Sequence, residues 1–198
     1  MGRPRQFDET QALDRALEYF WQHGYEAASV RDLADAMDLT GASLYNAFGD
    51  KPALYRRALE HYIDISVVDR IDRLKSRGPM KAIEGFFAEM IERSLRDPHR
   101  KGCMLVNAAL ESAPRDPELR ERVADVLRRI ESFFRRCVRA GQRDGTITQS
   151  QSAADLARML LGVQLGLRVL ARSRPEPALL HGMVRAAVAS LQPAGSSG

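Results

Sequence analysis

The segment from residue 29 to residue 51 carries the side chains best suited to recognising another molecule. Leu44 and Phe48 lie four residues apart, so in a helix they share one face, which we expect to be buried. The other positions of this helix then face outward, and they carry small or hydrogen-bonding side chains without charge. These positions are Gly41, Ala42, Ser43, Tyr45 and Asn46, and Thr40 directly before them is expected to cap the helix. Because a helix face exposed only to water usually carries charged residues, this face is typical of a helix that lies against base edges and phosphates.

A second short helix is predicted directly before this one. Ser29 is a favourable N-cap, and Asp32 three residues later completes an arrangement like a capping box. Leu33 and Met37 recur at helical spacing, and the pattern breaks at residues 38–40. Two short helices separated by so few residues predict a helix-turn-helix, whose second helix would enter a DNA major groove.

The distribution of charge does not by itself indicate a nucleic-acid-binding half. The chain has a formal net charge of +4, but residues 1–50 contain four Arg and nine Asp or Glu. Contacts to phosphate must therefore come from individually placed cations, and so few of them predict a weak dependence of DNA affinity on salt. The candidates are Arg3, Arg5, Arg31 and Lys51. Arg3 and Arg5 form a short basic arm that could equally be a solvated tail, and Arg31 could instead pair with Asp35.

The remaining residues predict a larger helical body and no strand. Apolar residues recur at steps of three and four, bounded by Gly or Pro, in the segments 8–23, 51–75, 79–96, 103–113, 116–140, 152–172 and 176–191. With the two short helices, this predicts an all-α fold of about nine helices. We expect a helix-turn-helix domain at residues 1–50, a ligand-binding and dimerisation domain at 51–192, and a disordered tail at 193–198.

Two runs of sequence are characteristic of one family. One joins Phe20-Trp21 and Gly24-Tyr25 to Ser29-Val30-Arg31-Asp32-Leu33-Ala34; the other extends from Leu39 to Lys51. Together they make residues 8–60 resemble the DNA-binding domain of TetR-family transcriptional regulators, and residues 101–111 resemble a helix of one broad subgroup. The resemblance implies an all-helical homodimer that binds double-stranded operator DNA and responds to a small-molecule effector.

The same resemblance assigns positions in the second short helix. Recognition-helix positions are occupied by Thr40, Gly41, Ala42, Ser43, Tyr45 and Asn46. Tyr45 and Lys51 fall at positions that usually contact phosphate. Asn46 departs from many members, which have His or Tyr there; Asn can bond adenine bidentately or hold a phosphate. The candidate DNA contacts are therefore Arg3, Arg5, Ser29, Arg31, Thr40, Gly41, Ala42, Ser43, Tyr45, Asn46 and Lys51.

Two groups of residues in the body are candidates for binding a ligand. Cys103, Asn107 and Glu111 share one face of a predicted helix, and this polar stripe could line a pocket if it faces inward. Phe86, Met90 and Phe133 could line a hydrophobic cavity, although core packing uses the same residue types.

Cys103 has a sharper alternative. It lies at a predicted helix N-terminus and follows Arg100 and Lys101, an environment that favours thiolate, so it could sense an oxidant or electrophile. The alternative is an inert core cysteine.

Small residues four apart predict a dimer seam in segment 152–172. Gly162 and Gly166 would let two helices approach closely, and the resemblance places the dimer interface on this segment and on 176–191. The candidates are Leu160, Gly162, Val163, Gly166, Leu167, Met183, Ala187 and Leu191. Packing within a single chain is the alternative.

Several classes of function find little support in the sequence. Cys103 and Cys137 lie outside any Cys-x-x-Cys pattern and the four His are scattered, so no metal site, disulfide framework or cofactor is expected. No catalytic order of residues or phosphate loop is present, which leaves an enzyme using Cys103 as the least favoured alternative. No run approaches the roughly 18 apolar residues of a membrane span, and the N-terminus lacks the pattern of a signal peptide, so we expect a cytoplasmic protein.

Together these features predict a ligand-responsive, DNA-binding transcriptional regulator. It would be a repressor released from a palindromic operator by a small molecule, or by an electrophile or oxidant. The alternative is a helical protein whose helix-turn-helix no longer binds DNA, which the negative balance of residues 1–50 supports.

Overall fold

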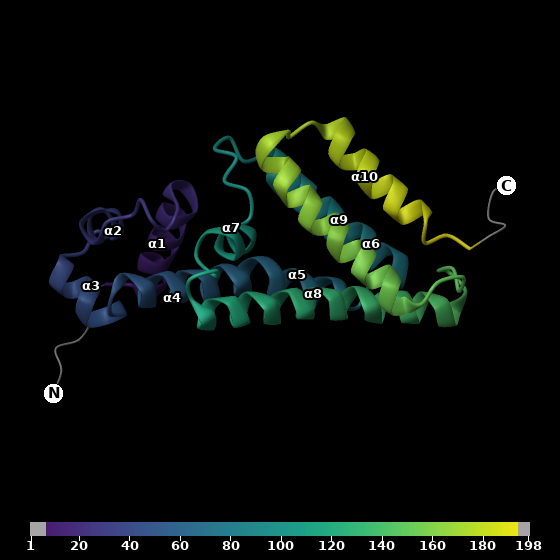
Figure 1. The fold of residues 1–198 in the computed structure, drawn as a ribbon, viewed down its shortest axis with the longest axis horizontal. Coiled ribbons are helices and arrows are strands. Elements are labelled where there is room, and N and C mark those ends of the chain that lie inside the picture. Colours follow the sequence, from purple (N-terminus) through teal and green to yellow (C-terminus); the bar gives the residue numbers. More distant parts are fainter. Residues whose placement is uncertain (1–6, 194–198) are drawn as a thin grey trace.

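A computed structural model describes residues 7–193, and this part of the chain is all-helical (Figure 1). Three short helices come first: α1 (Glu9–His23), α2 (Val30–Met37) and α3 (Gly41–Phe48). They are followed by a continuous helical rod, made of α4 (Lys51–Ile63), the π-helical turn η1 (Asp64–Val68) and α5 (Asp69–Leu74). The body then contains α6 (Pro79–Leu95), α7 (Met104–Glu111), α8 (Pro117–Asp144), α9 (Ala153–Ser173) and α10 (Pro177–Ala189). With the rod counted once, the described part has nine helices, which confirms the predicted fold class.

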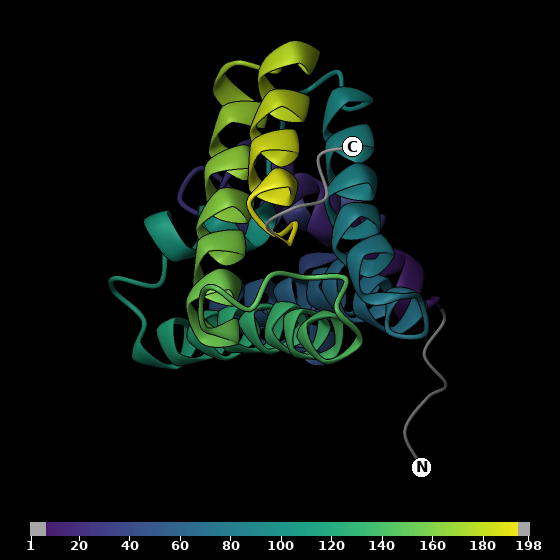
Figure 2. The same cartoon turned by 90° about the vertical axis from the view of Figure 1, so that its right-hand side faces the viewer.

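The rod connects the two ends of the molecule. Helices α1, α2 and α3 gather at one end of it, and α8 runs alongside it (Figure 1). Above the rod and α8, helix α6 lies on one side and α9 and α10 on the other (Figure 2). Aromatic rings of α6 and α8 fill the space between them: the centroids of Phe86 and Phe134 are 5.0 Å apart, and those of Phe87 and Phe134 are 5.5 Å apart and nearly parallel.

The helix starts follow the capping chemistry expected from the sequence. The side chains of Ser29, Thr40 and Asp50 accept backbone N–H groups at the first turns of α2, α3 and α4. Pro52 occupies the first turn of α4, where its missing N–H costs no hydrogen bond. The caps predicted at Ser29 and Thr40 are confirmed.

Two segments differ from expectation by more than the one or two residues found at the other helix ends. Helix α8 continues to Asp144, beyond residue 140, because Gly141 is a buried helical residue rather than a stop. A Cβ on Gly141 would lie 2.5 Å from Cγ1 of Ile147, so the glycine permits the close packing of the following loop. The segment expected as one α-helix over 51–75 contains the π-turn η1, in which Ser66 and Val67 are buried.

No helix in residues 7–193 has the length and apolar character required to cross a membrane.

Candidate functional site

Helices α2 and α3 form a helix-turn-helix with a three-residue turn. Asp38 begins the turn in the left-handed conformation (φ 57°), and its N–H bonds the carbonyls of Ala34 and Asp35. Leu39 follows, and Thr40 caps α3. The Asp32 N–H donates to Ser29 Oγ at 3.1 Å, and the Ser29 hydroxyl donates to the Asp32 carboxylate at 2.6 Å. This hydroxyl holds the pKa of Asp32 below its ordinary value, and the reciprocal bonds fix where α2 begins.

The outer face of α3 is uncharged and open, as the sequence predicts. Leu44 is 0% exposed and Phe48 is 3% exposed, so they anchor the helix to the core. Gly41, Ala42, Tyr45 and Asn46 are exposed and Ser43 is half-buried, and Tyr45 has 55% of its surface accessible. Helix α3 lies at the end of the molecule farthest from α10 (Figure 1), so a long partner can reach this face.

The hydroxyl groups of α3 are oriented by its N-cap. Thr40 Oγ1 accepts the Ser43 N–H at 3.1 Å and donates to Ser43 Oγ at 2.9 Å. The Ser43 hydroxyl therefore keeps its own proton available for donation to a partner. Tyr45 and Asn46 form no side-chain hydrogen bond within residues 7–193, which leaves the phenol and the amide free to bind outward.

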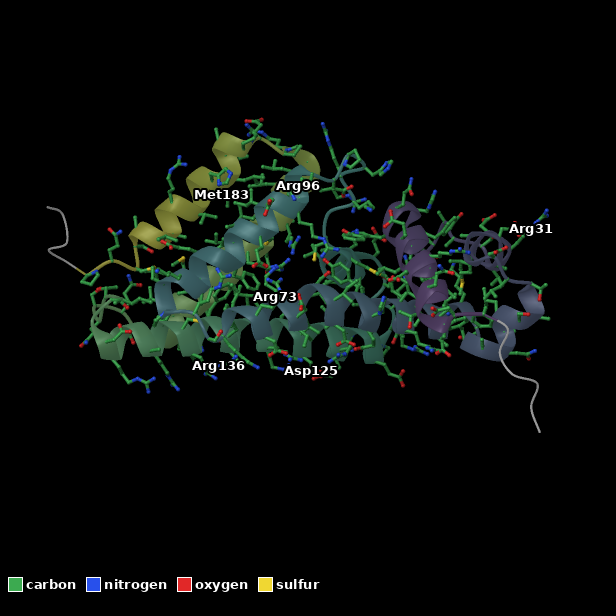
Figure 3. All side chains as sticks on the ribbon, turned by 180° about the vertical axis from the view of Figure 1, so that it is seen from behind. Arg31, Arg73, Arg96, Asp125, Arg136 and Met183 are labelled. Carbon is green, nitrogen blue, oxygen red and sulfur yellow. The ribbon has the colours of Figure 1, made fainter. Side chains whose placement is uncertain are left out.

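The predicted cations are less free than the polar side chains. Lys51 Nζ donates to the Glu26 carbonyl at 3.4 Å and lies 4.5 Å from the Tyr25 ring centroid, so it is held against the loop after α1. Arg31 extends into solvent from α2 (Figure 3) and makes no ion pair with Asp35 within the described residues. Arg3 and Arg5 lie outside the described part of the chain.

Two arginines that sequence reasoning missed hold the helix-turn-helix in place. Arg57 of α4 donates to the Ala47 carbonyl at 3.0 Å, lies 4.6 Å from the Phe48 ring centroid and pairs with Glu9. Arg15 of α1 donates to the Met37 carbonyl at 3.4 Å. Their spacing gives no sequence signal, because each is the charged edge of an amphipathic helix and its partner is distant in sequence.

Ion pairs join this unit to the body. Lys101 Nζ lies 2.7 Å from Glu18, and Arg115 lies 2.9 Å from Glu26. A small cavity of about 230 Å³ opens at this junction and is lined by Tyr25, Glu26, Pro52, Tyr55, Ser112, Arg115, Asp116 and Leu119. Burial raises the pKa of Tyr55 to about 12, so its hydroxyl stays protonated there.

The polar stripe predicted on residues 103–111 does not face inward as a unit. The buried face of α7 is formed by Met104, Leu105 and Ala108, because the apolar residues compete successfully for the core. Asn107 is half-buried and accepts from Arg172 Nη1 at 2.9 Å, and Glu111 is exposed. That expectation was wrong for Asn107 and Glu111.

Cys103 points into the body. Its Sγ is buried and lies 3.3 Å from the Tyr62 hydroxyl, which donates to it.

The second group of predicted ligand residues is also buried. Phe86, Met90 and Phe133 are each 1% exposed, with the rings of Phe86 and Phe133 packed 5.5 Å apart. They line none of the described cavities, so the structure places them in the core.

The predicted dimer residues divide into two groups. Leu160, Leu167, Ala187 and Leu191 are buried within the single chain, so their placement on a seam is corrected: intramolecular packing uses them. Gly162 is exposed with no atom within 4 Å of a Cβ placed there, Gly166 faces Met183, and Val163 is half-buried.

An apolar groove extends this surface toward α7 and α8. It has a volume of about 320 Å³ and is lined by Leu105, Val106, Ala109, Leu110, Val123, Leu127, Leu165, Gly166 and Val169. Leu110 and Val169 are exposed large apolar side chains that sequence reasoning did not single out. The helical period predicts which apolar residues share one face of a helix. It does not predict which of these faces a neighbouring helix leaves uncovered.

Residues 7–193 contain no cluster of three or more His, Cys, Asp or Glu side chains able to hold a metal ion.

Comparison with known proteins gives matches over both halves of the chain. The family "Bacterial regulatory proteins, tetR family" matches residues 12–58, and "Tetracyclin repressor-like, C-terminal domain" matches residues 79–188. The chain is similar to the HTH-type transcriptional regulator YezE of Bacillus subtilis, with 33% identity over 87% of this chain and 90% of YezE. It is also similar to the HTH-type transcriptional repressor ComR of Escherichia coli, with 31% identity over 86% of this chain and 82% of ComR.

A solved structure is similar over nearly the whole chain. It contains a cysteine mutant of the TetR family transcriptional regulator CifR in complex with a 26-base-pair double-strand operator DNA. The identity is 33%, the match covers 96% of this chain and 100% of CifR, and the TM-score is 0.84.

The caps of α3 predict a separation of stability from surface chemistry. Thr40→Ala removes an N-cap and should lower the free energy of unfolding by about 1 kcal/mol. Asn46→Ala removes an exposed amide without an internal partner and should change it by less than about 0.5 kcal/mol. Urea unfolding followed by circular dichroism measures both. Equal losses for the two variants would contradict the assignment of Asn46 to a free outer face.

Proposed function

The chain belongs to the TetR family of bacterial regulatory proteins, and on that premise we propose that it is a homodimeric repressor that binds a palindromic operator and is released by a small-molecule effector. The observation that carries the proposal is the outer face of α3, which is exposed, uncharged and lined with hydrogen-bonding groups. Base edges in a major groove present the donors and acceptors that such a face can pair with.

The relatives support repression rather than activation, and operator DNA as the target. ComR is named a repressor, and the CifR structure contains operator DNA. Membership of this family also makes the chain a regulator and not an enzyme, which confirms the expectation of no catalytic activity. A helix-turn-helix that no longer binds DNA is less consistent with α3, since nothing in residues 7–193 covers its polar side chains.

We assign residues 1–50 to DNA binding and residues 51–192 to effector binding and dimerisation. The dimer contact would use Gly162, Gly166 and Met183 together with the apolar groove, whose lining includes Leu110 and Val169. Gly162 has open space where a side chain would lie, which would let a second copy of α9 approach closely there, while Gly166 packs against Met183 of its own chain. The pair of α3 helices would then sit in successive major grooves, roughly 34–36 Å apart.

The effector would act by binding one spacing of the two α3 helices better than the other, because a ligand shifts an equilibrium only by its differential affinity. An uncharged or charged small molecule in the body fits this scheme. An electrophile or oxidant acting at Cys103 is the alternative. It is less favoured since Cys103 is 3% exposed and its sulfur already accepts the Tyr62 hydroxyl.

Substitutions on α3 test DNA binding. Asn46→Ala and Tyr45→Ala should each weaken binding to the chain's own upstream DNA by about 10- to 100-fold, because each removes one to three kcal/mol of contact. Gln22→Ala, an exposed amide at the far end of α1, is the matched control and should bind like the wild type. Fluorescence anisotropy over a range of salt concentrations measures both affinity and the salt slope, which should be shallow. A wild-type protein with no preference for this DNA over a scrambled fragment would contradict the proposal.

A charge in the proposed seam tests the dimer. Gly162→Glu would bury a carboxylate without a partner between two copies of α9, so the dissociation constant of the dimer should rise at least about 100-fold. Ala88→Glu, on the exposed face of α6, is the matched control and should leave it unchanged. Sedimentation velocity at micromolar concentration reads out the result. A wild-type monomer under these conditions would refute the seam.

Alkylation tests the alternative at Cys103. We expect N-ethylmaleimide to modify Cys103 in the folded protein much more slowly than in urea, because the buried thiol is inaccessible. Mass spectrometry of quenched samples gives the two rates, with Cys103→Ser as the control that identifies the site. Rapid modification of the folded protein, with loss of DNA binding that Cys103→Ser prevents, would instead establish an electrophile-responsive regulator.

A further inference from the structure

The interior of the body contains arginines that the proposed DNA and dimer contacts do not use. Arg70 of α5 is 4% exposed and Arg168 of α9 is 5% exposed. Arg93 of α6 reaches the same region, where its Nη1 donates to the buried Ser66 Oγ at 3.0 Å. We name Arg70, Arg93 and Arg168 the guanidinium cluster. It lies where the rod, α6 and α9 meet.

Acidic residues compensate only part of this charge. Glu89 is the carboxylate nearest to Arg70, with 3.5 Å between Arg70 Nε and Glu89 Oε2. Arg73 extends from α5 toward α6 (Figure 3) and already donates a hydrogen bond of 2.9 Å to each carboxylate oxygen of Glu89. Arg168 makes no hydrogen bond or ion pair within residues 7–193. The cluster therefore has at least one cation more than its carboxylate can neutralise.

Buried polar atoms without partners mark the same place. Nε of Arg168 is buried without a hydrogen-bond partner, and Nε of Arg70 is buried with no hydrogen bond beyond its 3.5 Å ion pair with Glu89. The acceptor Oε1 of Gln164, one turn before Arg168 on α9, is also buried without a partner. Burial and repulsion from Arg168 lower the pKa of Arg70 to about 10, which still leaves it charged at neutral pH. Buried cations in folded proteins are normally paired, so these open donors require an explanation.

The groups around Arg70 and Arg168 indicate which kind of ligand could pair with their open donors. A guanidinium matches the planar fork of a carboxylate or similar oxyanion. The Phe86 ring lies 5.3 Å from the Arg70 guanidinium carbon, which supplies an apolar surface beside the charge. Ser66 accepts from Arg93, so its hydroxyl proton is free to donate. These groups together suit an anion attached to an apolar body.

We propose that the guanidinium cluster binds the carboxylate of a small apolar acid and that this acid is the effector, a step that rests on the proposed function. The cluster lines none of the described cavities, so α6 and α9 must part from the rod to admit the ligand. Arg93 is exposed at the edge of the cluster, 5.6 Å from the Trp21 ring centroid, and marks the route from the surface. Because Arg70 belongs to the rod that begins three residues after α3, binding there biases the position of the DNA-reading helix.

Matched acid and amide probes test this site. The thermal unfolding of the full chain is measured with sodium benzoate and with benzamide, at equal ionic strength adjusted with NaCl. Benzoate should raise Tm by roughly 3–5 °C at about tenfold above its dissociation constant, and benzamide should not. Arg70→Gln and Arg168→Gln should abolish the shift. Arg172→Gln, one turn after Arg168 on α9 but exposed, should retain it.

The ligand-free variants distinguish a binding role from a structural one. Arg168→Gln without benzoate should have a Tm equal to or above that of the wild type, because it removes a buried charge without a partner. If it does not fold, Arg168→Lys keeps the charge but not the fork, and should weaken the benzoate shift. Equal shifts with benzoate and benzamide, no shift with either, or a shift retained in Arg168→Gln would overturn the proposal.

Operator binding separates the two levels of inference. A benzoate shift in a protein that binds no DNA would leave the anion site standing and refute the proposed function. DNA binding by the wild type that benzoate does not weaken, despite a Tm shift that depends on Arg168, would refute the effector role of the site.

Discussion

Burial of the rod from Lys51 to Leu74 is the constraint on which the rest of the structure depends. Leu54, Ala58 and Leu59 are fully buried in its first half, and in its second half Leu74 is fully buried and Ile71 nearly so. The rod thus has a core contact along its whole length, against α1 at one end and α6 at the other. Since stability here comes from tertiary packing of apolar faces, neither the helix-turn-helix nor the body can move without disturbing a shared core. That coupling is what a regulator needs between an effector site and a DNA-reading helix.

The outer face of α3 can remain uncharged because residues elsewhere hold the helix-turn-helix in place. Leu44 and Phe48 anchor α3 from below, and Arg57 fixes its C-terminal end through the Ala47 carbonyl. Lys101 and Arg115 join the unit to the body through Glu18 and Glu26. Many acidic residues of the first 50 therefore serve internal contacts rather than repelling a polyanion. The negative balance of this segment is compatible with DNA binding for that reason.

Local rules predicted much of this fold from sequence alone. The caps at Ser29, Thr40 and Asp50 depend on neighbours within four residues, so the starts of α2, α3 and α4 could be predicted. The spacing of Leu44 and Phe48 likewise predicts the buried face of α3. Contacts across the fold could not. Gly141 looks like a helix stop until Ile147 is seen against it, and Glu111 looks like a pocket residue until Met104 and Leu105 occupy the core instead. Arg168 gave no signal, because an arginine in an amphipathic helix is ordinarily solvated.

Arg70 and Arg168 also bear on how the two states of a regulator could be balanced. A buried guanidinium that lacks a partner raises the free energy of the closed body, by an amount that exceeds the roughly 1–3 kcal/mol of an unsatisfied neutral donor. An anion that pairs with both removes this cost only in the state that admits it. Differential binding of a few kcal/mol is the scale required to shift a two-state equilibrium by two or more orders of magnitude. The π-turn η1, between Tyr62 and Arg70, gives the rod a point at which its helical register can change. The free-energy cost of burying the guanidinium cluster is then also the source of a high sensitivity to an anionic effector.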